Sequence, residues 1–224
     1  MAGGDRVGNV IETIIIPVYN AYEKLQRCVE SIDIPVKNLL IINNGVGRVD
    51  VPHRAENQIV LEMPSNLGVG PAWNLGIKLF PWSSGWVFLN SDAWFEPGAA
   101  QVFASCFKRD NIVLAGVPGW CCAYVGDEVV GWVGLFSECY VPAYFEDVDY
   151  ERRATDAGIS VVKSGANVNH DNASTIRSDD RLNAMHMGRF RINRDLHNKR
   201  WFTGTPEAGH WDLRRRRELG WDAT

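Results

Sequence analysis

Short apolar runs alternate along the chain with segments whose apolar residues recur with helical spacing. The run Val10–Val18 is rich in β-branched residues and is followed by turn-forming residues, which is typical of a buried strand. Residues Tyr22–Ile32 then place their apolar side chains on one side of a helix. Similar short runs predict buried strands at Leu39–Ile42, Ile59–Met63 and Trp86–Asn90. Strands that alternate with helices predict a mostly parallel sheet with helices on both faces, and so an α/β fold.

The same alternation continues through the second half of the chain. The predicted helices are Pro71–Phe80, Ala99–Phe107 and Glu146–Ala157. The predicted strands are Ile112–Val117, a strand or hairpin arm at Val129–Leu135, and a strand that begins at Ser160–Lys163 and ends near His170. From Ser178 onward the pattern is polar and irregular. We interpret residues 178–224 as a C-terminal extension that packs on a single domain formed by residues 1–177.

Length and composition limit the classes of protein. A chain of 224 residues with 46% hydrophobic residues can bury one large α/β core. Its apolar runs are far shorter than the roughly 18 residues that a membrane span needs, and Met1–Asn9 has no apolar stretch of signal-peptide length. The five cysteines form no CxxC pair, which favours buried free thiols over disulfides or a zinc site. We therefore expect a cytoplasmic protein with no membrane span.

The net charge of −4 conceals an asymmetry. Residues 1–177 carry 13 basic and 20 acidic side chains, whereas residues 178–224 carry 10 basic and 7 acidic ones. The basic run Arg214–Arg217 lies in this tail. A basic tail on an acidic body favours a segment that faces a diphosphate or an acidic partner, and the alternative is a solvated helix face. We expect no nucleic-acid partner.

Three of the predicted strands end in polar, turn-forming tetrads. These are residues 18–21 (VYNA), 43–46 (NNGV) and 90–93 (NSDA). Ligands of open α/β sheets bind beyond the carboxyl ends of parallel strands. The three tetrads therefore predict a binding site at one edge of the sheet.

Two of the polar residues have the chemistry of cation ligands. Asp92 follows an apolar strand, and its oxygens suit a divalent cation that neutralises a diphosphate leaving group. His170 follows another strand some 80 residues later, and imidazole suits ions such as Mn²⁺. The alternatives are a turn or helix-capping aspartate and a surface histidine.

A cluster of carboxylates opens the helix predicted at Glu146–Ala157. Glu146, Asp147 and Asp149 lie in its first turn, where the helix dipole favours negative charge. The aromatic and apolar residues before them would keep one carboxylate partly away from water, as a general base requires. Glu146 or Asp147 could then accept a proton from a hydroxyl group.

A glycine loop opens the helix predicted at Pro71–Phe80. Residues Asn66–Pro71 (NLGVGP) place backbone amides where a helix end can receive an anion. The loop matches neither the dinucleotide-binding nor the P-loop pattern, so those two classes are not supported.

Taken together, the motifs resemble a glycosyltransferase of the GT-A fold, of the family 2 type that includes rhamnosyltransferase-like enzymes. The resemblance covers about Ile14 to Ser174. It rests on the order and spacing of six motifs: Pro17–Asn20 (PVYN), Asn43–Gly45 (NNG), the loop and helix with Asn66, Gly68, Asn74 and Gly76, Asn90–Asp92 (NSD), Tyr144–Tyr150 (YFEDVDY), and His170 with Ser174 beyond it.

The resemblance implies an inverting sugar transfer from a nucleoside-diphosphate sugar, with a UDP-sugar favoured, to a hydroxyl of a glycan, protein or small molecule. It implies that Asp92 and His170 hold Mn²⁺ or Mg²⁺ on the diphosphate. Asp147, beside Glu146, would be the base that deprotonates the acceptor, and the transition state would resemble an oxocarbenium ion. The residues expected at the donor are Pro17, Tyr19, Asn20, Asn43, Asn66, Gly68, Asn74 and Ser91.

Two positions depart from the family pattern. Asn43 stands where the family usually has aspartate, and an amide both donates and accepts hydrogen bonds, so the preference for uracil is in doubt. Residues 90–92 contain one carboxylate only, which makes metal binding depend more on His170 and the diphosphate.

Two other classes of function compete with sugar transfer. A nucleotidyltransferase that builds an activated sugar would carry a glycine-rich signature near its first strand, and Ile16–Asn20 is not of that kind. A sugar-nucleotide-binding or carbohydrate-binding module without catalysis would have lost the base or the metal ligands. Asp92, Asp147 and His170 are all present.

Overall fold

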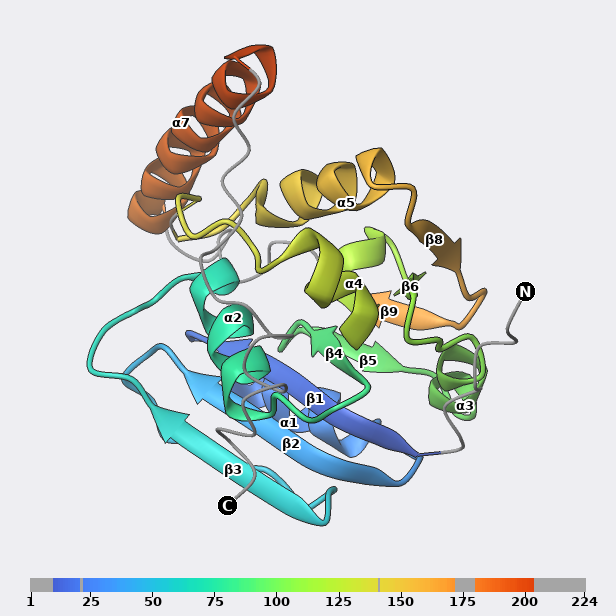
Figure 1. Ribbon diagram of the computed structural model, residues 1–224. Coiled ribbons are helices and arrows are strands. Elements are labelled where there is room, and N and C mark those ends of the chain that lie inside the picture. Colours follow the sequence, from blue (N-terminus) through green and yellow to red (C-terminus); the bar gives the residue numbers. More distant parts are fainter. Residues whose placement is uncertain (1–9, 21, 141, 172–179, 204–224) are drawn as a thin grey trace.

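A seven-stranded sheet forms the centre of the computed structural model, which describes residues 10–20, 22–140, 142–171 and 180–203 (Figure 1). The strand order is β3-β2-β1-β4-β7-β6-β8. The neighbours β3, β2, β1 and β4 run parallel, β8 runs parallel to β6, and β7 runs antiparallel to both β4 and β6. The strands are β1 Ile11–Val18, β2 Val36–Asn43, β3 Asn57–Glu62, β4 Gly85–Leu89, β6 Asn111–Ala115, β7 Cys122–Gly126 and β8 Ser160–Lys163. The prediction of a mostly parallel α/β sheet is confirmed.

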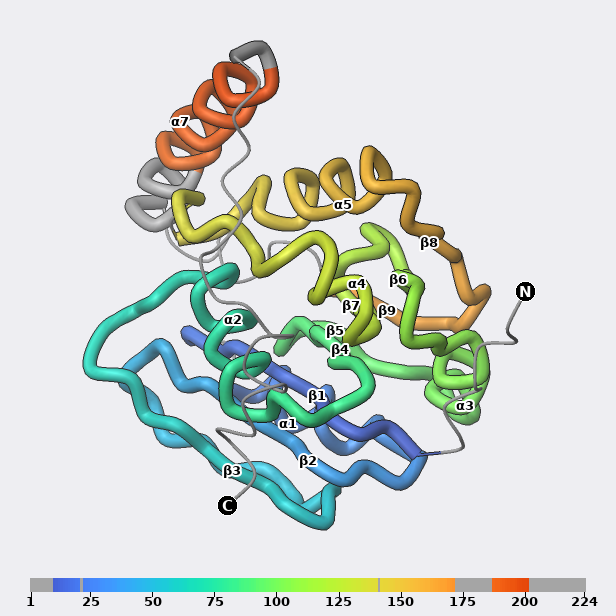
Figure 2. The backbone as a smooth tube through the Cα atoms, in the orientation of Figure 1, coloured from blue at the N-terminus to red at the C-terminus, as the bar shows by residue number. Residues whose placement is uncertain are grey.

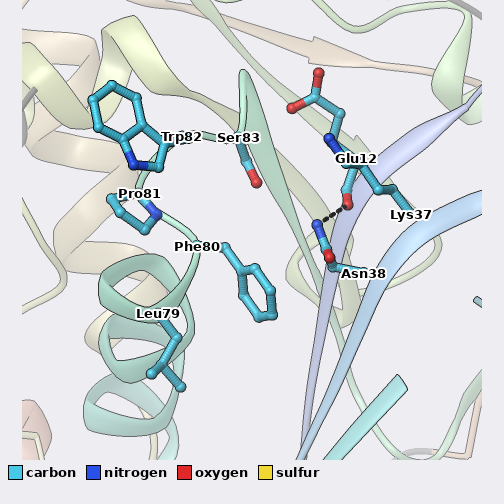
Figure 3. A pocket seen from close by; sticks show the side chains of 8 residues that line it. All are labelled: Glu12, Lys37, Asn38, Leu79, Phe80, Pro81, Trp82 and Ser83. Atoms are coloured by element: carbon cyan, nitrogen blue, oxygen red, sulfur yellow. Dashed lines mark hydrogen bonds between the residues drawn. The ribbon is translucent and has the colours of Figure 1, made fainter. Parts of the chain in front are cut away.

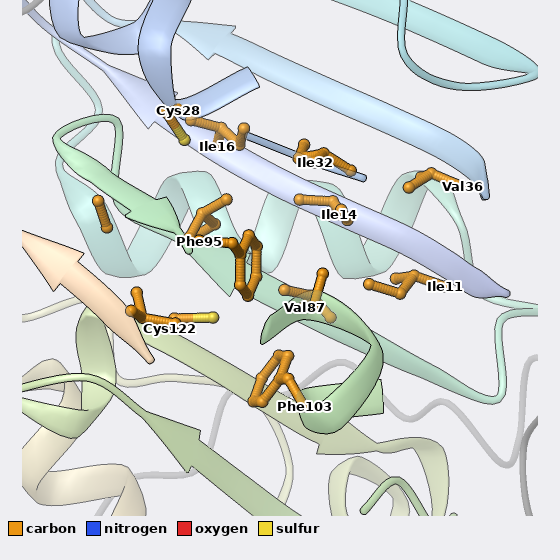
Figure 4. Close-up of a cluster of buried hydrophobic side chains, with 14 of the residues drawn as sticks. Ile11, Ile14, Ile16, Cys28, Ile32, Val36, Val87, Phe95, Phe103 and Cys122 are labelled. Carbon is orange, nitrogen blue, oxygen red and sulfur yellow. The ribbon is translucent and has the colours of Figure 1, made fainter. Parts of the chain in front are cut away.

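Helices cover both faces of this sheet. One face packs on α1 and α3, and the other on α2, α4 and α5 (Figure 1). The side chains of β1 alternate between the two layers: Ile14 and Ile16 pack with the first, and Ile15 with the second. Figure 4 shows part of the first layer. The helices are α1 Tyr22–Glu30, α2 Val69–Leu79, α3 Ala99–Ala104, α4 Asp127–Val133 and α5 Glu146–Asp156.

A small antiparallel ribbon lies beside the main sheet. Its strands are β5, Ala93–Phe95, and β9, Val168–His170. The sequence predicted one strand from Ser160 to about His170, and this is wrong. The chain turns at Gly165, which has φ of +71°, so β8 joins the main sheet and β9 joins the ribbon.

The segment predicted as a strand or hairpin arm at Val129–Leu135 is instead the helix α4. Its valines are typical of strands, and they misled the prediction. Two acidic residues, Asp127 and Glu128, begin the helix, and Val129, Val130 and Val133 lie on its buried side. The antiparallel partner of β4 is β7, which the pattern did not predict.

The region after Ser178, predicted to be irregular, contains the 24-residue helix α7, Asp180–Thr203. Its apolar residues do not recur with helical spacing, so the pattern gave no sign of a helix. Figures 1 and 2 show α7 projecting beside the segment that leads into α5. Among the described helices, none combines the length and apolar character needed to cross a bilayer. The run Arg214–Arg217 lies outside the described residues.

Candidate active site

The carboxyl ends of β1, β2 and β4 meet at one edge of the sheet. The last residue of β1, Val18, pairs in register with Asn43, the last residue of β2. The amide of Asn44 donates to the carbonyl of Val18 at 2.7 Å. On the other side of β1, Ile15 pairs with Phe88 of β4, one residue before that strand ends. The three polar tetrads therefore lie at the same edge.

Asp92 and His170 meet at this edge. Asp92 follows β4 and precedes β5, and the pairing of β5 with β9 places His170 opposite Ala93. His170 Nε2 lies 3.0 Å from Asp92 Oδ1, and both side chains are largely buried, with 8% and 15% of their surface exposed. The amide of Asp171 donates to the carbonyl of Asp92 at 3.0 Å, which fixes the two loops together. Ser91 lies half-buried beside them.

This pair fits a divalent cation as two of its ligands. Adjacent ligands of an octahedral ion with bonds of about 2.1 Å lie about 3.0 Å apart, which is the separation of the two donor atoms. Within the described ranges, no group of three or more His, Cys, Asp or Glu side chains is arranged to hold a metal.

The end of β1 supplies an open surface beside this pair. Tyr19 has 48% of its surface exposed, and Asn20 is exposed as well. Pro17 is half-buried within β1. The exposed ring of Tyr19 is suited to stack on a nucleotide base.

Asn43 is completely buried, and its side chain is engaged on every side. Its Nδ2 donates to the carbonyl of Gly47 at 2.7 Å and to Glu62 Oε2 at 2.6 Å. Its Oδ1 accepts from the hydroxyl of Tyr22 at 2.9 Å and from the amide of Gly45 at 3.1 Å. An amide has two donor hydrogens and two acceptor sites, so Asn43 has no hydrogen bond left for a nucleotide. Its expected contact with the donor stays a prediction that this geometry does not favour.

Glu62 is an exposed carboxylate next to Asn43. It ends β3, pairs in register with Asn43 and is exposed. One of its oxygens accepts from Asn43, and the rest of its acceptor capacity faces solvent. Sequence reasoning missed Glu62, because this residue becomes a neighbour of Asn43 only through the pairing of β2 with β3.

The glycine loop is held by side chains of the same edge. Asn66 Oδ1 accepts from the amide of Gly68 at 2.9 Å, and Asn44 Oδ1 accepts from the amide of Leu67 at 3.3 Å. Gly68 has φ of +90°, and a Cβ there would lie 2.7 Å from the carbonyl oxygen of Pro142. The amide of Val69 donates to that same oxygen at 2.8 Å. The amides of Leu67, Gly68 and Val69 are therefore engaged within the chain. The binding of an anion by the backbone amides of this loop stays a prediction that these hydrogen bonds do not favour.

Asn74 lies in the interior of the protein. Its Nδ2 donates to the carbonyl of Phe136 at 2.9 Å and to Glu138 at 2.8 Å, and its Oδ1 accepts from the amide of Phe136 at 2.9 Å. The side chain joins α2 to the segment after α4. This placement indicates a structural role, whereas the resemblance implied a contact with the donor.

The start of α5 carries one buried carboxylate, Glu146, and one half-buried carboxylate, Asp147. Glu146 is buried, lies against Gly70 at the start of α2, and has an oxygen, Oε2, with no hydrogen-bond partner among the described residues. Burial, together with the neighbouring Asp147, raises the pKa of Glu146 well above its ordinary value. Burial also raises the pKa of Asp147, whose Oδ1 accepts from the amide of Val148 at 2.8 Å. A carboxylate with a raised pKa is a better proton acceptor, as a general base requires.

The third carboxylate of this turn is structural. Asp149 is fully buried and forms an ion pair with Arg153 at 2.9 Å, one helical turn later. Arg153 also donates to the carbonyls of Val133 and Leu135. The spacing of four residues was visible in the sequence, but the burial of the pair was not.

A second concave region lies away from this edge. A pocket of about 140 Å³ is lined by residues near the starts of β1 and β2 and by the segment after α2 (Figure 3). Its carboxylate, Glu12, already accepts from the amide of Ser84 at 2.7 Å. The pocket lies at the amino ends of the parallel strands, opposite the candidate active site.

Comparison with solved structures identifies the class of this fold. Residues of this chain superpose on GalNAc-T7 in complex with UDP, GalNAc and Mn²⁺ with a TM-score of 0.59 and 8% identity, over 71% of this chain and 43% of that one. They superpose on a mutant of Drosophila β1,4-galactosyltransferase 7 in complex with manganese, UDP-Gal and xylobiose with a TM-score of 0.54 and 12% identity, over 77% and 75% of the two chains. The fold is that of the GT-A glycosyltransferases. The chain spans less than half the length of GalNAc-T7.

Comparison of sequences identifies the family. The model for glycosyl transferase family 2 matches residues 13–128, slightly more than half of the chain. The chain belongs to this family. A search of curated proteins gives no match.

Proposed function

We propose that the protein transfers a sugar, with inversion, from a nucleoside-diphosphate donor to an acceptor hydroxyl. The observation that carries this proposal is the meeting of Asp92 and His170 at 3.0 Å, at the edge where β1, β2 and β4 end. The glycine loop connects that edge to the desolvated carboxylates at the start of α5, through Asn44 and Pro142. The site therefore combines a cation-binding pair with a candidate base.

In the proposed reaction Asp147 acts on the acceptor. Its carboxylate accepts the proton of the acceptor hydroxyl as that oxygen bonds to the anomeric carbon and the bond from this carbon to the diphosphate oxygen breaks. The nucleoside diphosphate leaves with the electron pair of that bond. A divalent cation held by Asp92 and His170 would supply positive charge that stabilises this leaving group. Glu146 lies buried beside Asp147, and burial together with the charge of Asp147 raises the pKa of Glu146.

Two side chains at this edge of the sheet support the binding of a nucleotide, without specifying its base. Tyr19 offers an exposed ring, and Glu62 offers a carboxylate able to accept an N–H of the base. The two superposed structures contain UDP or UDP-Gal together with manganese. A UDP-sugar and Mn²⁺ or Mg²⁺ are therefore the first donor and cations to test. A hexosyl or deoxyhexosyl donor of the rhamnosyltransferase-like branch, a glycan, protein or small-molecule acceptor, and a cytoplasmic location stay predictions.

A donor panel tests the proposal directly. UDP-, dTDP- and GDP-sugars are incubated with the protein in Mn²⁺, in Mg²⁺ and in EDTA, and the released nucleoside diphosphate is measured. We expect metal-dependent release that is lost in Asp92→Ala and in Asp147→Asn. Asp156→Asn is the matched control, since Asp156 is exposed at the far end of the same helix as Asp147. If donors bind but neither wild type nor control releases diphosphate, the protein is a sugar-nucleotide-binding module.

A further inference from the structure

The helix α7 contacts the segment that leads into α5. The side chain of Asn193 is buried, and its Nδ2 donates to the carbonyl of Ala143 at 2.8 Å and lies 3.4 Å from the carbonyl of Tyr144. Near the other end of α7, Arg200 donates to the hydroxyl of Ser137 at 2.9 Å. The helix therefore holds both ends of the segment 137–144.

That segment ends in a backbone conformation which its residues disfavour. Tyr144 and Phe145 have φ of 78° and 77°, in the left-handed region, and Phe145 is the residue that caps the start of α5. For residues other than glycine this region is disfavoured, because the Cβ atom comes too close to the following carbonyl oxygen. The turn sets the direction in which α5 begins, and so the placement of Glu146 and Asp147. Such a conformation persists only where surrounding contacts enforce it.

Aromatic side chains of α7 supply these contacts. The ring of Phe190 lies 5.3 Å from that of Tyr144 and 5.2 Å from that of Phe145, and the ring of His197 lies 5.3 Å from that of Phe145. The hydroxyl of Tyr140 lies 3.4 Å from His197 Nδ1 and donates to Asp149 of α5 at 3.2 Å. The helix thus packs against both residues of the left-handed turn.

These contacts are separate from the two hydrophobic cores. In the part of the chain that the structure describes, neither core cluster contains a residue of α7. Loss of a contact made by α7 should therefore disturb the turn before α5 more than it disturbs the sheet and its helices.

We propose that α7 is a positioning element of the active site, and that Asn193 is a positioning residue for Asp147. The amide of Asn193 holds the carbonyls of the left-handed turn, and Phe190 and His197 cover its two side chains. The catalytic part of this inference rests on the proposed function, in which Asp147 is the base. The proposal thereby gives α7, which belongs to the C-terminal extension, a role in turnover.

The test compares Asn193→Ala with Asn198→Ala, which removes an exposed amide from the same helix. We expect Asn193→Ala to lower kcat about tenfold or more, with the donor KM within about twofold of wild type and the Tm close to that of the control. Asn193→Asp, which keeps the shape but loses the N–H donor, should behave like the alanine variant. A kcat unchanged in both Asn193 variants, with donor turnover intact in the wild type, overturns the proposal.

Hydrogen exchange gives a readout that does not depend on sugar transfer. Amides of residues 143–147 should exchange faster in Asn193→Ala than in wild type or in Asn198→Ala, while amides of β1 and β4 keep their protection. If wild type turns over no donor, the proposed function fails, and this measurement still decides whether α7 holds the turn. Equal exchange in all three proteins overturns the proposal.

A double-mutant cycle tests the left-handed turn itself. Glycine adopts positive φ without steric cost, so Tyr144→Gly should reduce the need for enforcing contacts. We expect Asn193→Ala to accelerate amide exchange over residues 143–147 less in the Tyr144→Gly background than in wild type. An acceleration as large in both backgrounds contradicts the role of the turn.

Discussion

Nε2 of His170 lies 3.0 Å from Oδ1 of Asp92, although 78 positions separate the two residues in the sequence. The pairing of β5 with β9 creates this contact, because it places His170 opposite Ala93, the residue after Asp92. The ribbon formed by these two short strands therefore brings the two proposed cation ligands together.

Removal of either member of this pair should weaken cation binding. We expect His170→Ala to lower the affinity for Mn²⁺ by about 10-fold or more, and Asp92→Asn to lower metal-dependent turnover by about 100-fold or more. Electron paramagnetic resonance of free Mn²⁺ measures the first effect in the presence of UDP. Asp110→Asn is the control, since Asp110 is an exposed carboxylate after α3. Unchanged Mn²⁺ affinity in both His170→Ala and Asp92→Asn would show that the cation is bound elsewhere.

The proposed base predicts the direction of the pH dependence. Burial raises the pKa of Asp147 above the ordinary value for aspartate, about 3.9, and the base works only when deprotonated. Turnover should therefore fall, as the pH is lowered, at a higher pH than an exposed aspartate would give. Asp147→Asn should lower kcat by about 100-fold or more and abolish this acidic limb. If the fall in turnover at low pH persists in Asp147→Asn, that fall is caused by the protonation of another group.

Glu146 should lower the stability of the protein at neutral pH. Because burial raises its pKa, the folded state binds the proton of Glu146 more tightly than the unfolded state does. This contribution to stability is complete below the ordinary glutamate pKa of about 4.3 and decreases as the pH rises toward the folded value. Glu146→Gln cannot ionise and should gain Tm relative to wild type as the pH rises from 5 to 8.

The size of this gain follows from the domain's length. A change of 1 kcal/mol moves the Tm by about 2–4 °C in a domain of this size, so a gain of a few degrees at pH 8 is expected. Glu56→Gln removes an exposed carboxylate before β3 and should show no such trend. A difference between Glu146→Gln and wild type that does not vary with pH would mean that Glu146 does not titrate differently on folding.

Restoring the aspartate that the family usually has at position 43 should destabilise this chain. The new carboxylate would face Glu62 and the carbonyl of Gly47, both acceptors, at the places where the amide now donates. We expect Asn43→Asp to lower the free energy of unfolding by about 2 kcal/mol or more at pH 7, measured by urea denaturation. Glu62→Gln should recover part of this loss in the double variant, because its amide can donate to the new carboxylate. Full stability of Asn43→Asp alone would contradict the described hydrogen bonding.

Asn74 should matter for stability and not for the donor. Asn74→Ala leaves the amide and carbonyl of Phe136 without their partners, which should cost about 1–3 kcal/mol in the free energy of unfolding. The dissociation constant for the nucleoside diphosphate, measured by calorimetry, should stay within about twofold of wild type. A tenfold loss of nucleotide affinity at unchanged stability would instead support the contact implied by the family resemblance.

The sequence alone indicated the fold class and the two residues, Asp92 and His170, that we propose as cation ligands. The apolar runs around Ile14–Ile16 and Leu39–Ile42 are buried on both faces, so their composition is itself the signal of a central parallel strand. Asp92 and His170 could be selected because each follows such a run or a strand end. The helices α4 and α7, in which pattern and structure do not correspond, were predicted wrongly, and β8 and β9 were predicted as one strand.

Only the tertiary structure decided how the polar residues are used. Asn43 and Asn74 resemble donor-binding residues in the sequence, yet the pairing of β2 with β3 and the packing of α2 engage all or most of their hydrogen-bonding groups inside the chain. The apolar residues around Asn193 show no helical periodicity in the sequence, yet α7 places the side chain of Asn193 against the turn before Asp147. Local sequence determines which strands are buried, because burial follows composition. The partners of a hydrogen-bonding side chain are set by contacts between distant segments, which composition does not encode.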